Sequence, residues 1–426
     1  LKEINPIDLA DGWEYFDQQQ RLILFKLLDH HRAVEVFEQL KFEDQYYLMG
    51  NLEPGSLGPV ITDLPPEDVT KFFHRLPDKI VKKLLTLMKK EDIEQVQKHM
   101  SYKEGSAGRI MHADFPKLKP DFTARQALDH IQASVHSKQG EQIHSFFVTN
   151  QSDQLLGKLS LNQLIAAPRD MRLYDLMTPV QLLKVNGNQD QEEVAHLFTK
   201  YDLIDAPVVD NDNRLIGVVT IDDVVDVINQ EATEDIAKMA GTEAEELTTR
   251  SVVNVVKARM PWLMASWVGG IIASILIGKF EHILGQIVAL AAFLPVIMGM
   301  GGNVGSQSST IVVRGLATGY IKVNELAKVF FKEVRVALIL GIGYGILLAV
   351  AAFVLYGMQL SFQFPLVVGL GIIFSITFAS TLGAMLPMLF KRIGIDPAVA
   401  TGPFVSTITD IMSIVIYFSM AGILLL

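Results

Sequence analysis

The sequence predicts a multidomain protein with an all-α N-terminal helical superhelix, an α/β pair of repeated units and a five-helix α transmembrane domain. Three observations predict this organisation. Charged residues are concentrated before residue 260, two similar strand–turn–strand segments lie between residues 109 and 230, and long uncharged stretches follow Pro261. Averages over all 426 residues, such as 50% apolar residues and a mean hydropathy of +0.29, conceal this division.

The charge is divided unequally along the chain. Only five of the 47 acidic residues and eight of the 37 basic residues lie from Pro261 onward, so residues 1–260 carry a net charge of −13 and the remainder +3. An acidic soluble part argues against nucleic acid and anionic lipid as ligands and suits cations. The absence of cysteine excludes disulfides, thiolate zinc sites and cysteine nucleophiles. The first segment is mixed and charged, unlike a signal peptide, so we expect the acidic part in the cytosol.

Five spans are predicted, because a helix needs about 20 mainly apolar residues to cross a membrane. The first is Met260–Gly278 and the last is Ala398–Leu426. Between them, Ile283–Val313 contains a proline and several glycines, so we expect one span with an irregular segment. Val336–Phe390 is long enough for two spans around a turn at Gly357–Pro365.

The loop charges predict the orientation of these spans. Basic residues gather in alternate connections, at residues 251–259, 314–335 and 390–397. The positive-inside rule therefore places the N-terminal part in the cytoplasm and the C-terminus outside. Glu281 and Glu333 lie at span ends, where we expect a loop charge or a side chain that reaches to the interface.

Polar side chains recur inside the second and fifth spans. Asp410 is the only charged residue of the last apolar run, and Ser406 precedes it by four residues, just after a break at Gly402-Pro403. A carboxylate at membrane depth costs at least a few kcal/mol, so it normally faces a partner or a water-filled path. Asn303 and Gln307 are also four apart and share a helix face. These groups predict an ion path with Asp410 and Asn303 as ligands; the alternatives are an Asp that only joins two helices and a small-residue packing seam.

Residues 1–108 are predicted to form a helical N domain. Leu52, Leu64 and Leu76 recur every twelve residues, and proline follows the last two. Proline is tolerated at a helix start, so this pattern predicts short helices stacked in a repeat-like scaffold. Its acidic residues are expected to be solvated.

Residues 109–168 and 169–230 are predicted to be two similar α/β units. The first has strands at Phe146–Thr149 and Leu155–Ser160, and the second has strands at Ala206–Val209 and Leu215–Thr220. A strand that ends in Gly-x-x-Thr-x-x-Asp before a helix resembles a CBS domain pair, whose Thr and Asp contact ribose when a nucleotide is bound. The second unit keeps Thr220 and Asp223, but the first has Ser160 and Gln163, so ATP or another adenine nucleotide is not expected as a ligand.

An acidic helix is predicted directly before the first span, from Ile221 to Met239, and residues 231–258 are expected to connect the α/β units to the membrane domain. Asp223 with Asp226, and Glu231 with Glu234 and Asp235, fall on adjoining faces. Like charges at this spacing repel by a few tenths of a kcal/mol per pair, which a bound cation would relieve. The pattern suits either a solubilising helix or a regulatory element, and its location favours the second.

The whole chain resembles the MgtE magnesium transporter/channel family in the order of its parts: helical N domain, two CBS units, a connecting plug helix and five spans in residues 259–426. The segments that carry this resemblance are Glu231–Asp235, Gly301–Gln307 and Asp396–Asp410. The resemblance implies a Mg²⁺-selective homodimer in the cell membrane, with a pore between the membrane parts and Asp410 of each subunit at the ion. It also implies that cytosolic Mg²⁺ closes the pore by binding acidic residues of the CBS units and plug. The matching positions are Asp190, Glu192, Asp202, Asp223, Asp226, Glu231, Glu234 and Asp235.

The N domain matches the family less closely, because Lys71 stands where one of two acids is expected, with Glu67 as the other. Two other functions remain open from the residues alone. A coupled secondary carrier of divalent cations would suit the same pattern, and a membrane-bound sensor would not need polar residues in two spans. The sequence has no nucleophile–base grouping, P-loop or His-rich metal motif, so an enzyme is not expected.

Overall fold

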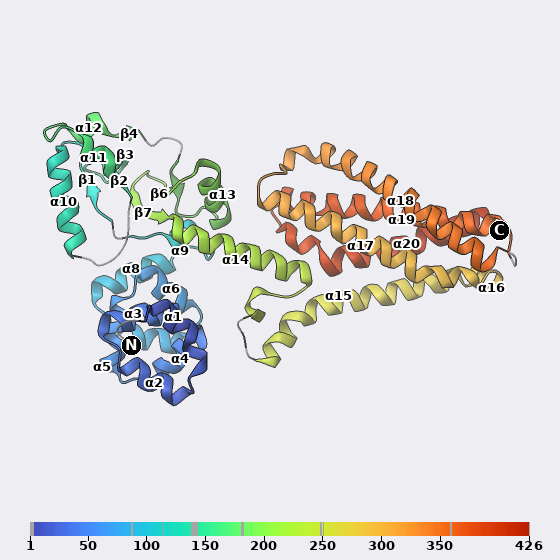
Figure 1. Cartoon of the computed structure of the whole chain (residues 1–426), viewed down its shortest axis with the longest axis horizontal. Coiled ribbons are helices and arrows are strands. Elements are labelled where there is room, and N and C mark those ends of the chain that lie inside the picture. Colours follow the sequence, from blue (N-terminus) through green and yellow to red (C-terminus); the bar gives the residue numbers. More distant parts are fainter. Residues whose placement is uncertain are drawn as a thin grey trace. The chain divides into compact units, whose positions relative to one another are not determined.

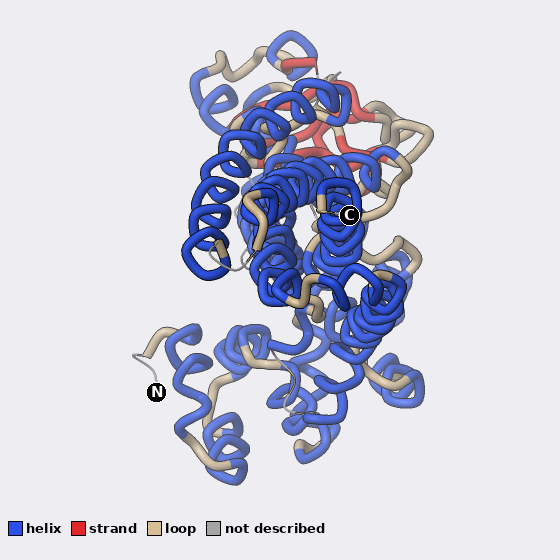
Figure 2. Tube along the Cα trace, turned by 90° about the vertical axis from the view of Figure 1, so that its right-hand side faces the viewer, coloured by secondary structure: helices blue, strands red, loops and turns tan. Residues whose placement is uncertain are grey.

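The computed structural model describes residues 4–86, 88–113, 115–137, 144–179, 183–247, 249, 251–357 and 360–425. The chain divides into two compact units, Leu1–Ile228 and Asn229–Leu426 (Figure 1). Strands occur only in the α/β part of the first unit among the described residues (Figure 2). The predicted fold class is confirmed, whereas the finer domain boundaries stay predictions.

The N domain is a stack of short helices. They are α1 (Pro6–Asp11), η1 (Gly12–Tyr15), α2 (Gln18–Lys26), α3 (His30–Gln39), α4 (Phe42–Asn51), α5 (Pro54–Asp63), α6 (Pro66–His74), α7 (Asp78–Leu85) and α8 (Lys90–Met100). The three leucines spaced by twelve residues, Leu52, Leu64 and Leu76, all lie just after a helix and are buried in the core. The repeat in the sequence therefore marks the positions where each helix ends and turns its chain back onto the core.

The α/β part contains two small sheets. The first sheet has the order β1 (Lys117–Leu118), β2 (Ser145–Thr149), β3 (Leu155–Ser160) and β4 (Thr178–Pro179), and the second has β5 (Val185–Asn186), β6 (Asp205–Val209) and β7 (Leu215–Thr220). The helices of this part are α9 (Ala107–Ile110), α10 (Ala124–Ser137), α11 (Leu161–Ala166), α12 (Leu173–Leu176), α13 (Gln191–Tyr201) and the start of α14 (Ile221–Ala240). The four strands that the sequence predicts correspond to β2, β3, β6 and β7.

The two sheets share one local plan. β2 pairs antiparallel with β3 and β6 with β7, and each pair has a register shift one residue after a Val–Gly pair, Val148–Gly157 and Val208–Gly217. An added Cβ would meet Met177 Sδ at 2.8 Å from Gly157 and Met111 Sδ at 2.5 Å from Gly217. Only glycine fits under the covering methionine, so the duplication extends to side-chain packing.

The second unit contains five helices that are long and apolar enough to cross a membrane. They are α15 (Val252–Lys279), α17 (Ala289–Ala317), α18 (Leu326–Tyr356), α19 (Gln363–Arg392) and α20 (Gly402–Leu424), with the short elements η2 (Ala244–Leu247), α16 (Glu281–Gln286), η3 (Val323–Glu325) and η4 (Pro397–Ala400) between or beside them. All five predicted spans are confirmed. The helix α19 is the most buried of them and packs against α17, α18 and α20.

One expectation about the second span is wrong. The sequence predicts an irregular segment there, but α17 runs unbroken through Pro295 and its glycines, and only the short α16 precedes it. The glycines are instead packing positions, since Gly301 and Gly305 are buried against other helices. Close contact between helices in a membrane favours such small residues.

Candidate ion site and its control elements

The Asp410 carboxylate lies on α20 opposite α17. An added Cβ at Gly302 would be 3.7 Å from Asp410 Oδ1 and 3.9 Å from Ser406 Cβ, so Asp410 and Ser406 face the same point of α17, as their spacing predicts. Asp410 is partly buried, and within the described residues its carboxylate makes no hydrogen bond or ion pair. A carboxylate without a partner in such surroundings destabilises the fold unless a cation or water molecules bind it.

Asn303 and Gln307 extend this polar surface on α17. Both side chains are exposed, and Asn303 directly follows the glycine that faces Asp410. On the opposite side of the same helix, Gly305 contacts α19 and α20, with its added Cβ 3.3 Å from Ala379 O and 3.1 Å from Val405 Cγ1. The helix therefore has one packed face and one face that carries exposed amides beside the Asp410 carboxylate.

The fifth span begins with a sharp break, as the sequence predicts. Thr401 is extended, and α20 starts at Gly402, whose φ of +52° lies in the left-handed region. An added Cβ at Gly402 would be 2.3 Å from Met239 O, the carbonyl near the end of α14. Only glycine suits both the backbone angle and the approach of α14, so the acidic helix ends directly against the start of the helix that carries Asp410.

A lysine strengthens this contact. Lys238 of α14 donates a hydrogen bond to Asp396 Oδ2 at 2.5 Å and another to Glu234, and Asp396 Oδ1 accepts from Ala398 N at 2.8 Å. Burial acts to lower the pKa of Lys238, but the hydrogen bonds that it donates to Asp396 and Glu234 outweigh burial and raise the pKa above its ordinary value. Glu234, a predicted Mg²⁺ ligand, is therefore paired with a lysine in this structure.

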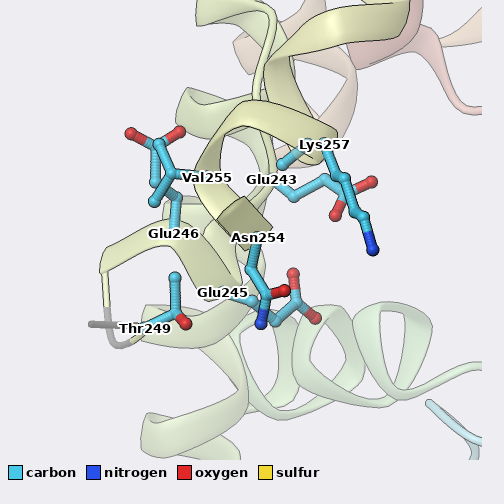
Figure 3. A pocket seen from close by; sticks show the side chains of 8 residues that line it. Glu243, Glu245, Glu246, Thr249, Asn254, Val255 and Lys257 are labelled. Carbon is cyan, nitrogen blue, oxygen red and sulfur yellow. The ribbon is translucent and has the colours of Figure 1, made fainter. Parts of the chain in front are cut away.

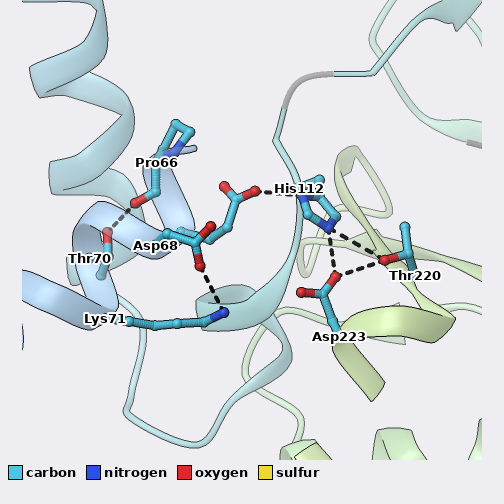
Figure 4. Close-up of polar contacts among 8 residues, drawn as sticks. Pro66, Asp68, Thr70, Lys71, His112, Thr220 and Asp223 are labelled. Carbon is cyan, nitrogen blue, oxygen red and sulfur yellow. Dashed lines mark hydrogen bonds and ion pairs between the residues drawn. The ribbon is translucent and has the colours of Figure 1, made fainter. Parts of the chain in front are cut away.

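Asp223, another predicted Mg²⁺ ligand, belongs to a network that joins the N domain to the second α/β unit (Figure 4). His112 Nδ1 lies 2.5 Å from Glu67 Oε1, and His112 Nε2 lies 2.6 Å from Asp223 Oδ2. Thr220 Oγ1 donates to Asp223 Oδ2 at 2.8 Å. Ionised carboxylates only accept hydrogen bonds, so the geometry suits an imidazolium that donates from both ring nitrogens.

This network affects the pKa of Asp223 and buries Glu67. Burial acts to raise the pKa of Asp223, but the hydrogen bond and charge of His112, together with Thr220, hold it below its ordinary value. Glu67 is only 1% exposed, so the expectation of a solvated acid is wrong there. Lys71 donates to Asp68 Oδ1 at 3.0 Å. The histidine lies 45 residues from Glu67 and 111 from Asp223 in the sequence, which is why local patterns do not reveal it.

The Thr–Asp motif of the second α/β unit is occupied from within, since Thr220 and Asp223 bond each other and His112. In the first unit, Ser160 and Gln163 form a capping box at the start of α11, with Gln163 N donating to Ser160 Oγ at 3.2 Å. In this arrangement both pairs are engaged in hydrogen bonds within the chain, and the expectation about adenine nucleotides stays a prediction.

The remaining predicted acids occupy separate places. Asp190 caps α13 and accepts from the backbone of Glu192 at 2.9 Å, while Asp202 ends the same helix in a left-handed conformation and is exposed. Asp226 is exposed on α14, and Glu231 and Asp235 lie partly buried farther along it. Within the described parts of the chain, no group of three or more His, Asp or Glu side chains is arranged to hold a metal ion.

A shallow pocket of about 390 Å³ lies where η2 meets the start of α15 (Figure 3). Glu243, Glu245 and Lys257 are among the residues that line it. Glu246, also at its edge, binds Arg259, with Arg259 Nε donating to Glu246 Oε2 at 2.9 Å, and also accepts from Thr242. These bonds lower the pKa of Glu246 to about 2. Part of the negative charge around this pocket is thus already balanced by Arg259.

A second expectation about the membrane helices is wrong. Glu333 is expected to be a loop or interface charge, but it is only 7% exposed and lies among α17, α18 and α19. Its Oε2 accepts from Ser308 Oγ at 2.9 Å and from Ser380 Oγ at 3.2 Å. The two serine hydroxyls, on helices that the sequence does not place together, compensate the buried carboxylate.

Family models match three regions of the chain. A model described as "Divalent cation transporter" matches residues 294–420, one described as "MgtE intracellular N domain" matches residues 4–105, and one described as "CBS domain" matches residues 173–230. The first region includes the Asp410 site, and the other two include the partners in the His112 network, Glu67 and Asp223.

Curated relatives extend over the whole chain. The magnesium transporter MgtE of Thermus thermophilus is 33% identical over 442 residues, covering 100% of this chain and 94% of the relative. The magnesium transporter MgtE of Bacillus subtilis is 29% identical and covers 99% and 92%. Among solved structures, the cytosolic domain of the Mg²⁺ channel MgtE in complex with ATP is 30% identical, with a TM-score of 0.51, over 53% of this chain and 91% of that one.

Proposed function

Because the chain belongs to the MgtE family of magnesium transporters, we propose that it carries Mg²⁺ across a membrane along a path beside Asp410. Membership in a transporter family also confirms that the chain is not an enzyme. The observation that carries the proposal is the Asp410 carboxylate: it is partly buried, faces Gly302 and has no bonding partner within the described residues. A divalent cation is the partner that its surroundings lack.

The chemistry of the ligands suits Mg²⁺ in particular. Mg²⁺ holds six oxygen ligands at about 2.0–2.1 Å and gives up its water reluctantly. Carboxylate and amide oxygens from Asp410, Asn303 and Gln307 can hold it through its water shell. Softer ions favour thiolate or imidazole ligands, and in the five membrane helices neither residue type occurs.

We place the path between two copies of the chain. The exposed amide face of α17 lies beside the Asp410 carboxylate, so a second copy would complete the site with the same residues. The distribution of basic residues supports an orientation with the N-terminal part in the cytoplasm and the C-terminus outside.

Regulation by cytosolic Mg²⁺ completes the proposed function. Residues 1–260 carry a net charge of −13, so without a cation the acidic parts of two subunits repel each other. Mg²⁺ bound among the acids of α13 and α14 would favour the compact arrangement, provided that it binds this arrangement more tightly. The contact of Met239 with the start of α20, and that of Lys238 with Asp396 just before η4, supply a physical link, because a movement of the end of α14 must move or release the helix that carries Asp410.

Flux through purified protein in liposomes tests the pore assignment. Asp410→Ala should abolish Mg²⁺ uptake while the protein still purifies as folded wild type does. Glu281→Ala removes an exposed carboxylate at the start of the short helix α16 and should conduct normally. Normal uptake by Asp410→Ala would refute the assignment. Uptake that saturates and requires Na⁺ would instead show a coupled carrier.

A further inference from the structure

The buried carboxylate of Glu333 is supported from two neighbouring helices. Ser308 comes from α17 and Ser380 from α19, and their hydroxyls lie 2.9 Å from each other as well as within hydrogen-bond distance of Glu333 Oε2. Lys332 Nζ is 3.9 Å from the other carboxylate oxygen and is largely exposed. A carboxylate removed from water needs this kind of compensation, so the three side chains act as one polar unit.

This unit lies on the packed side of α17, one helical turn from its tightest contact. An added Cβ at Gly383 of α19 would be 2.2 Å from Gly305 O, so the backbones of α17 and α19 touch there with no room for a side chain. Ser308 follows Gly305 by three residues, and Ser380 precedes Gly383 by three. The Glu333 hydrogen bonds therefore fix the same two helices at the next turn.

The surface of α17 that adjoins this packed side faces the proposed ion path. Gly302 lies against Asp410, and Asn303 is exposed next to it. The helix α17 packs against α19 and α20 along several turns, and the Glu333 hydrogen bonds add a directional contact that resists rotation and sliding of α17 on α19. The Glu333 unit thus contributes to where Asn303 stands relative to Asp410.

We propose that Glu333 is a positioning residue for Mg²⁺ recognition: through Ser308 it holds α17 so that its amide face and the Asp410 carboxylate are correctly spaced for the hydrated ion. The inference rests on the proposed function and deepens it. Sites of this kind depend on the side chains that orient their ligands, because small displacements of a ligand weaken binding.

The test compares Glu333→Leu with Glu333→Gln in liposome uptake over a range of Mg²⁺ concentrations. The amide oxygen of glutamine can still accept from both serines, so Glu333→Gln should keep the wild-type half-saturating concentration. Glu333→Leu cannot, and its half-saturating Mg²⁺ concentration should rise roughly tenfold, as when an orienting side chain around a metal is lost. Competition by Ca²⁺ should also strengthen in the leucine variant.

Ser308→Ala and Ser380→Ala remove one hydroxyl each with little change in volume, and they keep the test valid if Glu333→Leu does not fold. Both should shift the half-saturating concentration in the same direction by a smaller factor. A wild-type half-saturating concentration in Glu333→Leu, or in both serine variants when the leucine variant does not fold, would overturn the inference, even if the melting temperature fell. Absence of Mg²⁺ uptake by the wild type would instead refute the proposed function.

Discussion

The acids of the first unit and the Asp410 carboxylate differ in how they are compensated. In the first unit, Asp44 binds Arg21 at 2.5 Å, and Glu67 and Asp223 bind the two sides of His112. In the membrane unit, Glu333 has its serines, but Asp410 has no bonding partner within the described residues. Burial alone therefore does not identify an ion site. The proposed ion site rests instead on a carboxylate of a membrane helix that has no bonding partner within the described residues.

The largest expected effect concerns the acids of α14. Replacing Glu231, Glu234 and Asp235 together by Gln, Gln and Asn removes three negative charges that a regulatory cation would bridge. We expect a pore that stays open when Mg²⁺ is high on the cytoplasmic side, measured in patch recordings. Replacing the exposed Asp121, Asp212 and Asp222 by Asn removes the same number of charges, serves as the matched control and should leave closure intact. Unchanged closure in the triple variant would count against control by α14.

The next effect concerns the contact between α14 and the start of α20. Gly402→Ala places a Cβ 2.3 Å from Met239 O and adds left-handed backbone strain of about 1–3 kcal/mol, so α14 should be displaced. Lys238→Met removes the bond to Asp396 from the other side. Both variants should need severalfold more Mg²⁺ for half-maximal closure. Lys257→Met, at an exposed lysine of α15, serves as the control. If both variants close at the wild-type Mg²⁺ concentration, this contact does not couple Mg²⁺ binding to closure of the pore.

A third variant tests the compensation of acids in the first unit. His112→Ala leaves Glu67 and Asp223 buried without their shared partner, which should lower the free energy of unfolding by about 3–5 kcal/mol. His74, which is exposed and pairs with Glu104, provides the control His74→Ala, with a change below about 1 kcal/mol. Thermal or denaturant unfolding of the detergent-purified chain measures both. Equal stability of the two variants would show that the network contributes little.

The smallest effect is a pH dependence from His99, which is fully buried. Desolvation lowers its pKa to about 4, against an ordinary value near 6.5. Between these values the unfolded chain binds more protons than the folded one, so stability falls as the pH falls, by up to roughly 3 kcal/mol. His99→Leu should lose this part of the acid sensitivity, and the exposed His196→Leu should keep it. Identical pH profiles of unfolding for the two variants would contradict the assignment.

The sequence predicts those parts of the fold that leave a local pattern. Four strands, five spans, the helix turns at Leu52, Leu64 and Leu76, and the break at Gly402 each follow from periodicity, hydropathy or backbone preference. The shared helix face of Asp410 and Ser406 also follows from their spacing, but the spacing does not predict that this face meets α17. These features depend on neighbours within a few residues of each other.

The features that the sequence does not predict are contacts between distant residues. Lys238 and Asp396 are 158 residues apart, and Glu67 meets His112 across 45 residues. Glu333 beside a lysine at the start of a span has the pattern of an interface charge, and only the packing of α17 and α19 shows that it is buried. Local composition gives the charge of such a residue but not its partner.

Whether Asp410 binds the hydrated ion can be tested with cobalt(III) hexaammine, an exchange-inert, octahedral and trivalent complex similar in size and shape to hydrated Mg²⁺. If Asp410 holds the ion through its water shell, the complex should compete with Mg²⁺ for binding to the detergent-purified wild type, and its affinity, measured by calorimetry, should fall roughly tenfold or more in Asp410→Asn. Equal affinity of the two proteins for the complex, or no competition with Mg²⁺ in the wild type, would contradict this mode of ion binding.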